Sequence, residues 1–170
     1  MKDYKKEGKI EGSLIIEGNL ILTADLEVDN KLEVTGYINC ASYSIKAGGS
    51  IKAGGWIKAG GWIKAGGSIE AGGWIEAGDS IEAGDWIKAG GSILAQLWIK
   101  SITIKAGLYI YAGIVTWRTA QEGDDLIECS ELLGGEIKYG TLKLLDKQND
   151  AFDEARKLLE SNGFKVVKDI

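Results

Sequence analysis

Hydrophobic and polar residues follow one another along most of this chain in a unit of six residues. From Ile45 onward the units read IKAGGS, IKAGGW, IKAGGW, IKAGGS, IEAGGW, IEAGDS, IEAGDW, IKAGGS and ILAQLW. Isoleucine and alanine occupy positions 1 and 3, lysine or glutamate occupies nearly every position 2, and serine or tryptophan occupies position 6. Side chains two apart share one face of a strand. The pattern therefore predicts short β-strands with isoleucine and alanine turned inward and the charged residues and tryptophans turned outward.

The same frame extends backwards through LEVTGY, LEVDNK, LILTAD and LIIEGN to Leu14, and it fades through IKAGLY and IYAGIV near residue 115. Glycine pairs or Gly-Asp at positions 4 and 5 predict corners, where glycine also permits positive φ. A helix is excluded, because each glycine would cost about 1 kcal/mol relative to alanine. Such short strands bury nothing alone and become stable only when coils stack. We therefore predict an all-β fold, a parallel β-helix over residues 14–115.

A coil could hold two units or three, and the charges at position 2 distinguish these arrangements. With 12 residues per coil, four of the tryptophans form one ladder, but like charges lie over one another. With 18 residues per coil, Lys52, Glu70 and Lys88 alternate in sign, and only Lys46 over Lys64 is unfavourable. Each cross-strand pair is worth about 0.2–1 kcal/mol. We therefore expect a triangular solenoid of about 18 residues per coil, with about five and a half coils in a rod roughly 27 Å long.

The segments outside the repeat are expected to close the two ends of the solenoid, because unpaired strands recruit other chains. Residues 1–13 are charged and predict an N-terminal cap. Residues 116–170 predict a small α+β C-terminal cap or an oligomerisation module, with strands followed by a helix at about 150–161. A homodimer through this helix and the strand after it remains open.

The I-x-A frame on 18-residue coils, with starts such as KIEGSL, resembles the parallel β-helix of bactofilins, which are bacterial polymer-forming scaffold proteins. This resemblance covers roughly residues 9–115. The near-perfect IKAGG arrays are also similar to repeat proteins carried by phages and mobile elements of Gram-positive bacteria. The first resemblance implies end-to-end assembly, and the second implies a biological context without a specific activity.

Composition narrows the chemistry that the chain can perform. The chain has 170 residues, 45% of them hydrophobic, and it contains no histidine. Without histidine, imidazole bases, Ser-His-Asp and Cys-His nucleophiles and histidine-ligated metals are excluded. Acyltransferases and carbonic anhydrases built on hexapeptide β-helices depend on histidine. We therefore expect that the chain is not an enzyme and that it uses no cofactor.

Charge and cysteine content limit which partners, cell compartment and metal sites are expected. The net charge of −5 leaves no basic surface for nucleic acid. Neither a membrane helix nor a signal-peptide core is apparent. Because the two cysteines lie far apart and suggest no disulfide framework, we expect a protein of the reducing cytoplasm. Cys40 is expected to face the core, and acidic neighbours are expected to raise the thiol pKa of Cys129. Asp79 and Asp85 supply too few oxygens for calcium and suit turns, so no metal site is expected.

The tryptophans at position 6 and an acidic segment over residues 122–136 are the most informative features for function. Outward tryptophans beside charged residues are typical of interaction surfaces. Alternatively, each ring covers a glycine corner and a lysine stem, and the acidic segment is a solvated loop. The candidate partner-binding residues are Trp56, Trp62, Trp74, Trp86, Trp98, Asp124, Asp125, Glu128 and Glu131.

Together these features predict a non-enzymatic interaction protein whose rigid Trp and Lys/Glu ladders contact a protein partner. The likeness to mobile-element proteins implies, as one such partner, a host defence or nucleic-acid enzyme that the rod would inhibit. The alternative is a bactofilin-like structural protein of a cytoskeletal kind that assembles end to end. An ice-binding solenoid is a more distant alternative, because it would display flat threonine or serine arrays without charges.

Overall fold

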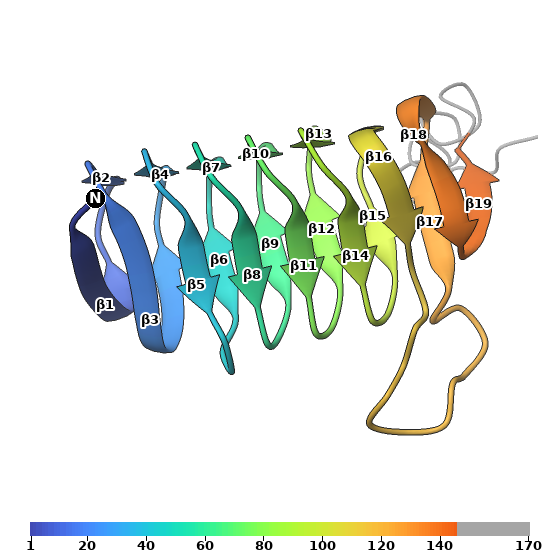
Figure 1. The fold of residues 1–170 in the computed structure, drawn as a ribbon, viewed down its shortest axis with the longest axis horizontal. Helices are drawn as coiled ribbons and strands as arrows, with labels where there is room; N and C mark the ends of the chain where they lie inside the picture. Colours follow the sequence, from blue (N-terminus) through green and yellow to red (C-terminus); the bar gives the residue numbers. More distant parts are fainter. Residues whose placement is uncertain (146–170) are drawn as a thin grey trace, which may run out of the picture.

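The computed structural model describes residues 1–145, and residues 146–170 lie outside the described part. The described residues form 19 strands, all of whose pairings are parallel, and they contain no α-helix. These strands build a β-solenoid of about eight stacked coils of about 18 residues, in which the N-terminus and the last strands lie at opposite ends of a rod (Figure 1). The fold class predicted from the sequence is confirmed.

Each regular coil contributes one short strand to each of three faces. Face 1 carries β2 (Leu14–Ile16), β4 (Leu32–Val34), β7 (Ile51–Ala53), β10 (Ile69–Ala71) and β13 (Trp86–Ala89). Face 2 carries β5 (Ile38–Cys40), β8 (Ile57–Ala59), β11 (Ile75–Ala77) and β14 (Ile93–Ala95). Face 3 carries β6 (Ile45–Ala47), β9 (Ile63–Ala65), β12 (Ile81–Ala83), β15 (Ile99–Lys100), β17 (Leu126–Cys129) and β19 (Thr141–Leu144).

Four longer strands bend around a corner and so belong to two faces. They are β1 (Asp3–Ile10) and β3 (Asn19–Val28) on faces 2 and 3, and β16 (Thr103–Tyr111) and β18 (Glu131–Tyr139) on faces 1 and 2.

Strand register confirms the 18-residue coil. Ile69 pairs with Ile51 on one side and with Ile87 on the other. From Ile45 to Ile99, the position-1 isoleucines are 0% exposed and the position-3 alanines are at most 4% exposed. Burying one isoleucine side chain contributes roughly 1.5–3 kcal/mol. This continuous apolar column therefore holds together strands that are too short to persist alone.

The glycines at position 4 are required by close approach between coils. Within the described residues, positive φ occurs only at Gly8, Gly12, Gly18, Gly113, Gly123, Gly135 and Gly140, all outside the regular units. A Cβ at Gly72 or Gly90 would instead lie 2.1 Å from the carbonyl oxygen one coil earlier. Gln96 occupies the same position in the last regular unit, and nothing in the structure explains how it is accommodated.

The stack is longer at both ends than the six-residue pattern suggests. β1, in the segment predicted as an N-terminal cap, pairs with β3 and belongs to the first coil. β17, β18 and β19 lack the regular unit, yet they continue the stack on β15, β16 and β17. The solenoid therefore extends beyond the predicted range of 14–115. The predicted helix at about 150–161 and the strand expected after it lie outside the described residues.

One long loop projects from the stack in the described part of the chain. It comprises residues 112–125, joins β16 to β17, and departs from the corner between faces 2 and 3 (Figure 1). We call it the Trp117 loop. No helix in residues 1–145 has the length and apolar character needed to cross a membrane.

Candidate functional site

The 18-residue coil distributes the tryptophans of the repeat over three corners of the rod. Trp56 and Trp74 are 18 residues apart and share the corner before face 2. Trp62 and Trp98 share the corner before face 3, two coils apart, and Trp86 lies at the corner before face 1. No single side of the rod therefore displays all five. The ladder of four tryptophans that a 12-residue coil would make does not form.

Trp56 and Trp74 belong to a stack of aromatic rings. The ring centroids of Tyr37 and Trp56 are 4.4 Å apart with an interplanar angle of 3°, and those of Trp56 and Trp74 are 4.9 Å apart with an angle of 2°. Both faces of the Trp56 ring are therefore covered by neighbouring rings. This arrangement supports the structural interpretation for these two tryptophans, because stacked rings stabilise adjacent coils.

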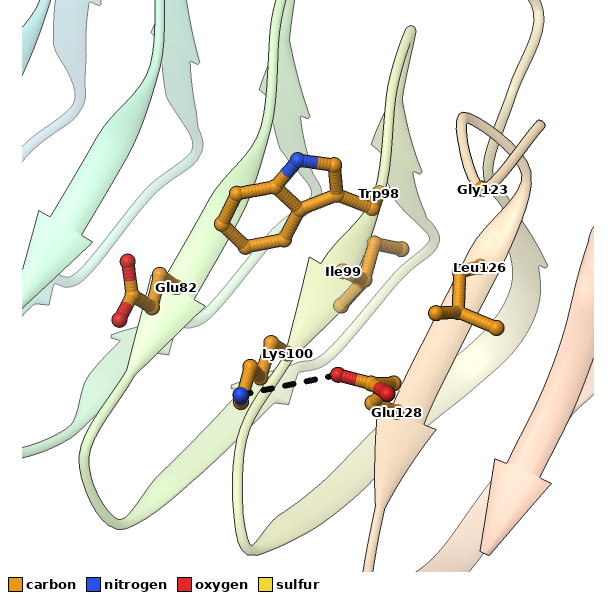
Figure 2. Close-up of a pocket in the computed structure, with 7 residues that line it drawn as sticks. All are labelled: Glu82, Trp98, Ile99, Lys100, Gly123, Leu126 and Glu128. Carbon is orange, nitrogen blue, oxygen red and sulfur yellow. Dashed lines mark ion pairs between the residues drawn. The ribbon is translucent and has the colours of Figure 1, made fainter. Parts of the chain in front are cut away.

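Trp98 lines a shallow hollow of about 300 Å³ on face 3. The hollow also contains Glu82, Lys100, Leu126 and Glu128, and Figure 2 shows the Lys100–Glu128 ion pair at its edge. Each charged residue of the hollow is already engaged in an ion pair, because Glu82 accepts from Lys64 at 2.8 Å. The charged groups that line the hollow are therefore already paired within the chain.

Trp86 is the most exposed tryptophan of the repeat, with 47% of its surface accessible. It lines a second groove on face 1, of about 380 Å³, together with Thr103, Lys105 and Leu133. Leu133 is 56% exposed. Trp86 is therefore the member of the predicted tryptophan set that remains most available to a partner.

The acidic candidates are held largely by contacts within the chain. Asp125 accepts a hydrogen bond from the Thr141 hydroxyl at 2.6 Å. Glu128 pairs with Lys143 at 2.7 Å and with Lys100 at 3.6 Å, and the hydrogen bond from Lys143 chiefly lowers the pKa of Glu128. Glu131 is exposed.

Asp124 is buried, and it braces the Trp117 loop. Its two carboxylate oxygens accept hydrogen bonds from both terminal nitrogens of Arg118, at 2.7 and 2.8 Å. The backbone N–H of Gln121 donates a third bond at 2.6 Å. The Arg118 hydrogen bond, followed by that of Gln121, lowers the pKa of Asp124. Bidentate Arg–carboxylate pairs fix orientation as well as distance.

The braced loop presents Trp117, which sequence reasoning did not select. This side chain is 58% exposed, more than any tryptophan of the repeat. The Arg118 guanidinium carbon lies 4.9 Å from the centre of the Trp117 ring. The Thr116 hydroxyl donates to the side-chain oxygen of Gln96 at 3.2 Å, which ties the loop to the rod. The available signal was that Trp117 is the sixth tryptophan of the chain and the one that follows the end of the repeat.

The described residues offer no metal centre or reactive thiol. No cluster of three or more histidine, cysteine, aspartate or glutamate side chains occurs in residues 1–145. Cys40 and Cys129 are 0% exposed, as expected for Cys40. Burial raises the pKa of the Cys40 thiol to about 12. Burial also raises the pKa of the Cys129 thiol, so burial is the main cause there and acidic neighbours are not.

The fold defines the chain as a parallel β-solenoid that carries a braced, projecting loop near the end of its described part. Comparisons with protein-family models, curated proteins and solved structures find no match.

Proposed function

We propose that the chain is a non-enzymatic interaction protein whose partner, another protein, contacts the Trp117 loop. The observation that carries this proposal is the exposure of Trp117 on a loop held by the bidentate Arg118–Asp124 pair. Tryptophan and arginine are enriched among the residues that dominate binding energy at interfaces. A loop fixed before binding also loses less conformational entropy when the complex forms.

The last described coils of the rod also expose apolar side chains. Exposed large apolar side chains concentrate in the same part of the chain, at Ile102, Leu108, Tyr109, Ile114, Trp117, Leu133, Tyr139, Leu142 and Leu144. The rest of the rod exposes only Met1, Ile15, Tyr43 and Trp86 among the described residues. Concentration of apolar surface at one end is typical of a recognition surface. The regular coils then act as a rigid support for it.

The test compares Trp117→Ser with Trp62→Ser as a matched control. Serine already occupies position 6 in several units, so Trp62→Ser removes a half-buried ring that the proposal does not use. A partner is first identified by crosslinking to the wild-type chain in a bacterial lysate and then purified. We expect Trp117→Ser to weaken its affinity by about 30-fold, the effect of an interface residue worth about 2 kcal/mol, while Trp62→Ser binds as the wild type does.

A second substitution separates the ring from the bracing of the loop. Asp124→Asn keeps Trp117 but removes the charged pair with Arg118, and we expect an intermediate loss of affinity because the loop must then be ordered on binding. Unchanged affinity for Trp117→Ser, with a folded protein by circular dichroism, would refute the proposed contact. A partner of the kind implied by the mobile-element resemblance, a cytoplasmic host defence or nucleic-acid enzyme, would lose activity in the complex.

A bactofilin-like scaffold of hexapeptide-type coils is the second candidate. Its support is the open edge of parallel strands at each end of the described stack, since such edges can pair with another copy. Sedimentation velocity distinguishes the two candidates. Polymers that grow with concentration favour the scaffold, whereas a discrete species over a hundredfold concentration range favours the interaction protein.

A further inference from the structure

The hollow on face 3 and the groove on face 1 each contain a tryptophan and a lysine, but they differ in one acidic group. On face 3, the residue that pairs with Lys100 in the next coil is Glu128, and the two side chains form an ion pair at 3.6 Å (Figure 2). On face 1, the residue that pairs with Lys105 in the next coil is Gly134, which has no side chain. The groove on face 1 therefore lacks the carboxylate that balances the lysine on face 3.

No other acidic group on face 1 balances Lys105. Lys88, its neighbour in the preceding coil, carries the same charge and pairs with Glu70 at 2.9 Å. Glu131 of β18 lies opposite Thr103 and forms no ion pair with Lys105. Lys105 is exposed and makes no ion pair within residues 1–145. The alternation of charge along this face thus ends on an unmatched positive charge.

The surface beside Lys105 combines apolar side chains with free space. Trp86 is 47% exposed and Leu133 is 56% exposed, and both line the groove of about 380 Å³. Even a Cβ at Gly134 would lie 3.5 Å from the Ala106 carbonyl oxygen and 3.8 Å from Cγ of Lys105. A side chain of another molecule therefore has room to reach Lys105 across this glycine.

We propose that this groove binds a segment of a partner protein in which a glutamate or aspartate lies close to an aliphatic side chain. The carboxylate pairs with Lys105, as Glu128 pairs with Lys100 on face 3. The aliphatic side chain packs on Trp86 and Leu133. Complementary charge selects an acidic segment and sets its register, while the exposed apolar side chains supply contact area.

This surface is separate from the one used in the proposed function. The groove lies on β13, β16 and β18 of face 1, whereas the Trp117 loop departs from the corner between faces 2 and 3 (Figure 1). The two proposals can therefore fail independently, and Trp117→Ser should leave binding at the groove unchanged.

A titration of the full chain with short peptides tests the proposal. The probe acetyl-Leu-Ser-Glu-amide copies the spacing of Leu126 and Glu128, which line the hollow on face 3. The signal followed by nuclear magnetic resonance is the indole N–H of Trp86, which is identified by its loss in Trp86→Ser. At low salt we expect this peptide to bind at least threefold more tightly than acetyl-Leu-Ser-Gln-amide, as an exposed ion pair allows. Acetyl-Ala-Ser-Glu-amide should also bind at least threefold more weakly, because it loses apolar contact.

Two lysine variants assign the charge preference to one residue. Lys105→Gln should bind the glutamate and glutamine peptides equally. Lys100→Gln is the matched control and should keep the preference, because Lys100 already pairs with Glu128. Equal affinities of the two peptides for the wild type, no shift of Trp86 at about 10 mM peptide, or a preference that survives in Lys105→Gln would each overturn the proposal. Acetate that shifts Trp86 as strongly as the glutamate peptide would show a site for a small anion only and would overturn it as well.

Discussion

At the scale of single residues, the glycines at position 4 of the repeat allow adjacent coils to approach closely. The missing side chain lets the backbone of one coil lie against the carbonyl oxygen of the coil before it. Gly91, at position 5, has more room, since a Cβ there would meet its nearest neighbours at 3.5 Å. In the IEAGD units position 4 stays glycine and aspartate stands at position 5, as Asp79 and Asp85.

Gly90→Ala should therefore destabilise the protein, whereas Gly91→Ala should not. A Cβ at Gly90 would lie 2.1 Å from the Gly72 carbonyl oxygen, so two coils must separate. Overpacking of this kind typically costs about 1–3 kcal/mol. An alanine at Gly91 makes ordinary contacts and reduces the entropy of the unfolded chain, which is worth about 0.4–1 kcal/mol in its favour. Urea unfolding of both variants measures the difference, and equal midpoints would contradict the steric explanation.

The burial of individual repeat residues could be predicted from the sequence, because alternation of period 2 fixes which side chains face inward. Cys40 is an example, since it occupies position 3 and is fully buried. The role of Trp117, Arg118 and Asp124 could not be predicted in this way. Their arrangement depends on the Arg118–Asp124 pair within a non-repetitive loop. A periodic pattern in the sequence does not indicate such a contact.

At the scale of strands, the position-2 side chains form ladders of ion pairs along each face. Glu70 pairs with Lys88 at 2.9 Å, and Glu76 pairs with Lys58 at 2.9 Å. The unfavourable step predicted for an 18-residue coil is present, since Lys46 lies next to Lys64. It is relieved because Lys46 pairs with Glu27 on one side, while Lys64 pairs with Glu82 on the other.

The charge ladder predicts how stability depends on pH. The pKa of Glu128 is lowered in the folded state, chiefly by the Lys143 hydrogen bond. Its contribution is therefore fully present above the ordinary glutamate pKa of 4.5 and is lost as the pH falls through the lowered value. Glu128→Gln should reduce the free energy of unfolding at pH 7 by up to about 1 kcal/mol.

As the pH falls below 4.5 and through the lowered pKa of Glu128, the wild type and Glu128→Gln should converge in stability, because the wild-type carboxylate becomes protonated. Glu131→Gln is the matched control, since Glu131 makes no ion pair within residues 1–145. Thermal melting of the three proteins between pH 3 and pH 7 checks both expectations. A constant gap between wild type and Glu128→Gln over that range would exclude the ion pair as its source.

The strands that carry the repeat could be predicted from the sequence, whereas the coil position of the strands that lack it could not. The alternating charges identified the 18-residue coil, because they report on neighbours one coil away. The strands over residues 126–144 alternate in polarity but lack the spacing that indicates a coil, so their place in the same stack was not evident. The charged composition of β1 likewise concealed that it pairs in register with β3.

At the scale of the whole molecule, the rod is stabilised mainly by contacts between adjacent coils. In such solenoids each repeat touches only its neighbours, so terminal coils have fewer contacts than central ones. β8 pairs with β5 on one side and with β11 on the other. β1 pairs with β3 alone among the described strands.

Native-state hydrogen exchange should therefore be slowest in the central coils. We expect the amides of β8 and β11 to exchange at least tenfold more slowly than those of β1, because fraying begins at the end of the stack. Exchange measured by mass spectrometry on peptides from residues 1–13 and 51–80 tests this. Uniform protection along the chain would mean that the rod unfolds as a single unit.

Because each coil is triangular, the length of the rod can be changed without changing the direction in which the Trp117 loop points. Inserting three six-residue units lengthens the support by one step of about 4.8 Å and leaves the Trp117 loop on its original corner. Inserting one unit instead turns everything beyond it to the next corner and breaks the alternation of charge. Tandem duplication of so uniform a repeat thus changes the rod length and the direction of the loop in fixed increments. Only insertions of three units, or multiples of three, keep the loop on the same corner of the rod.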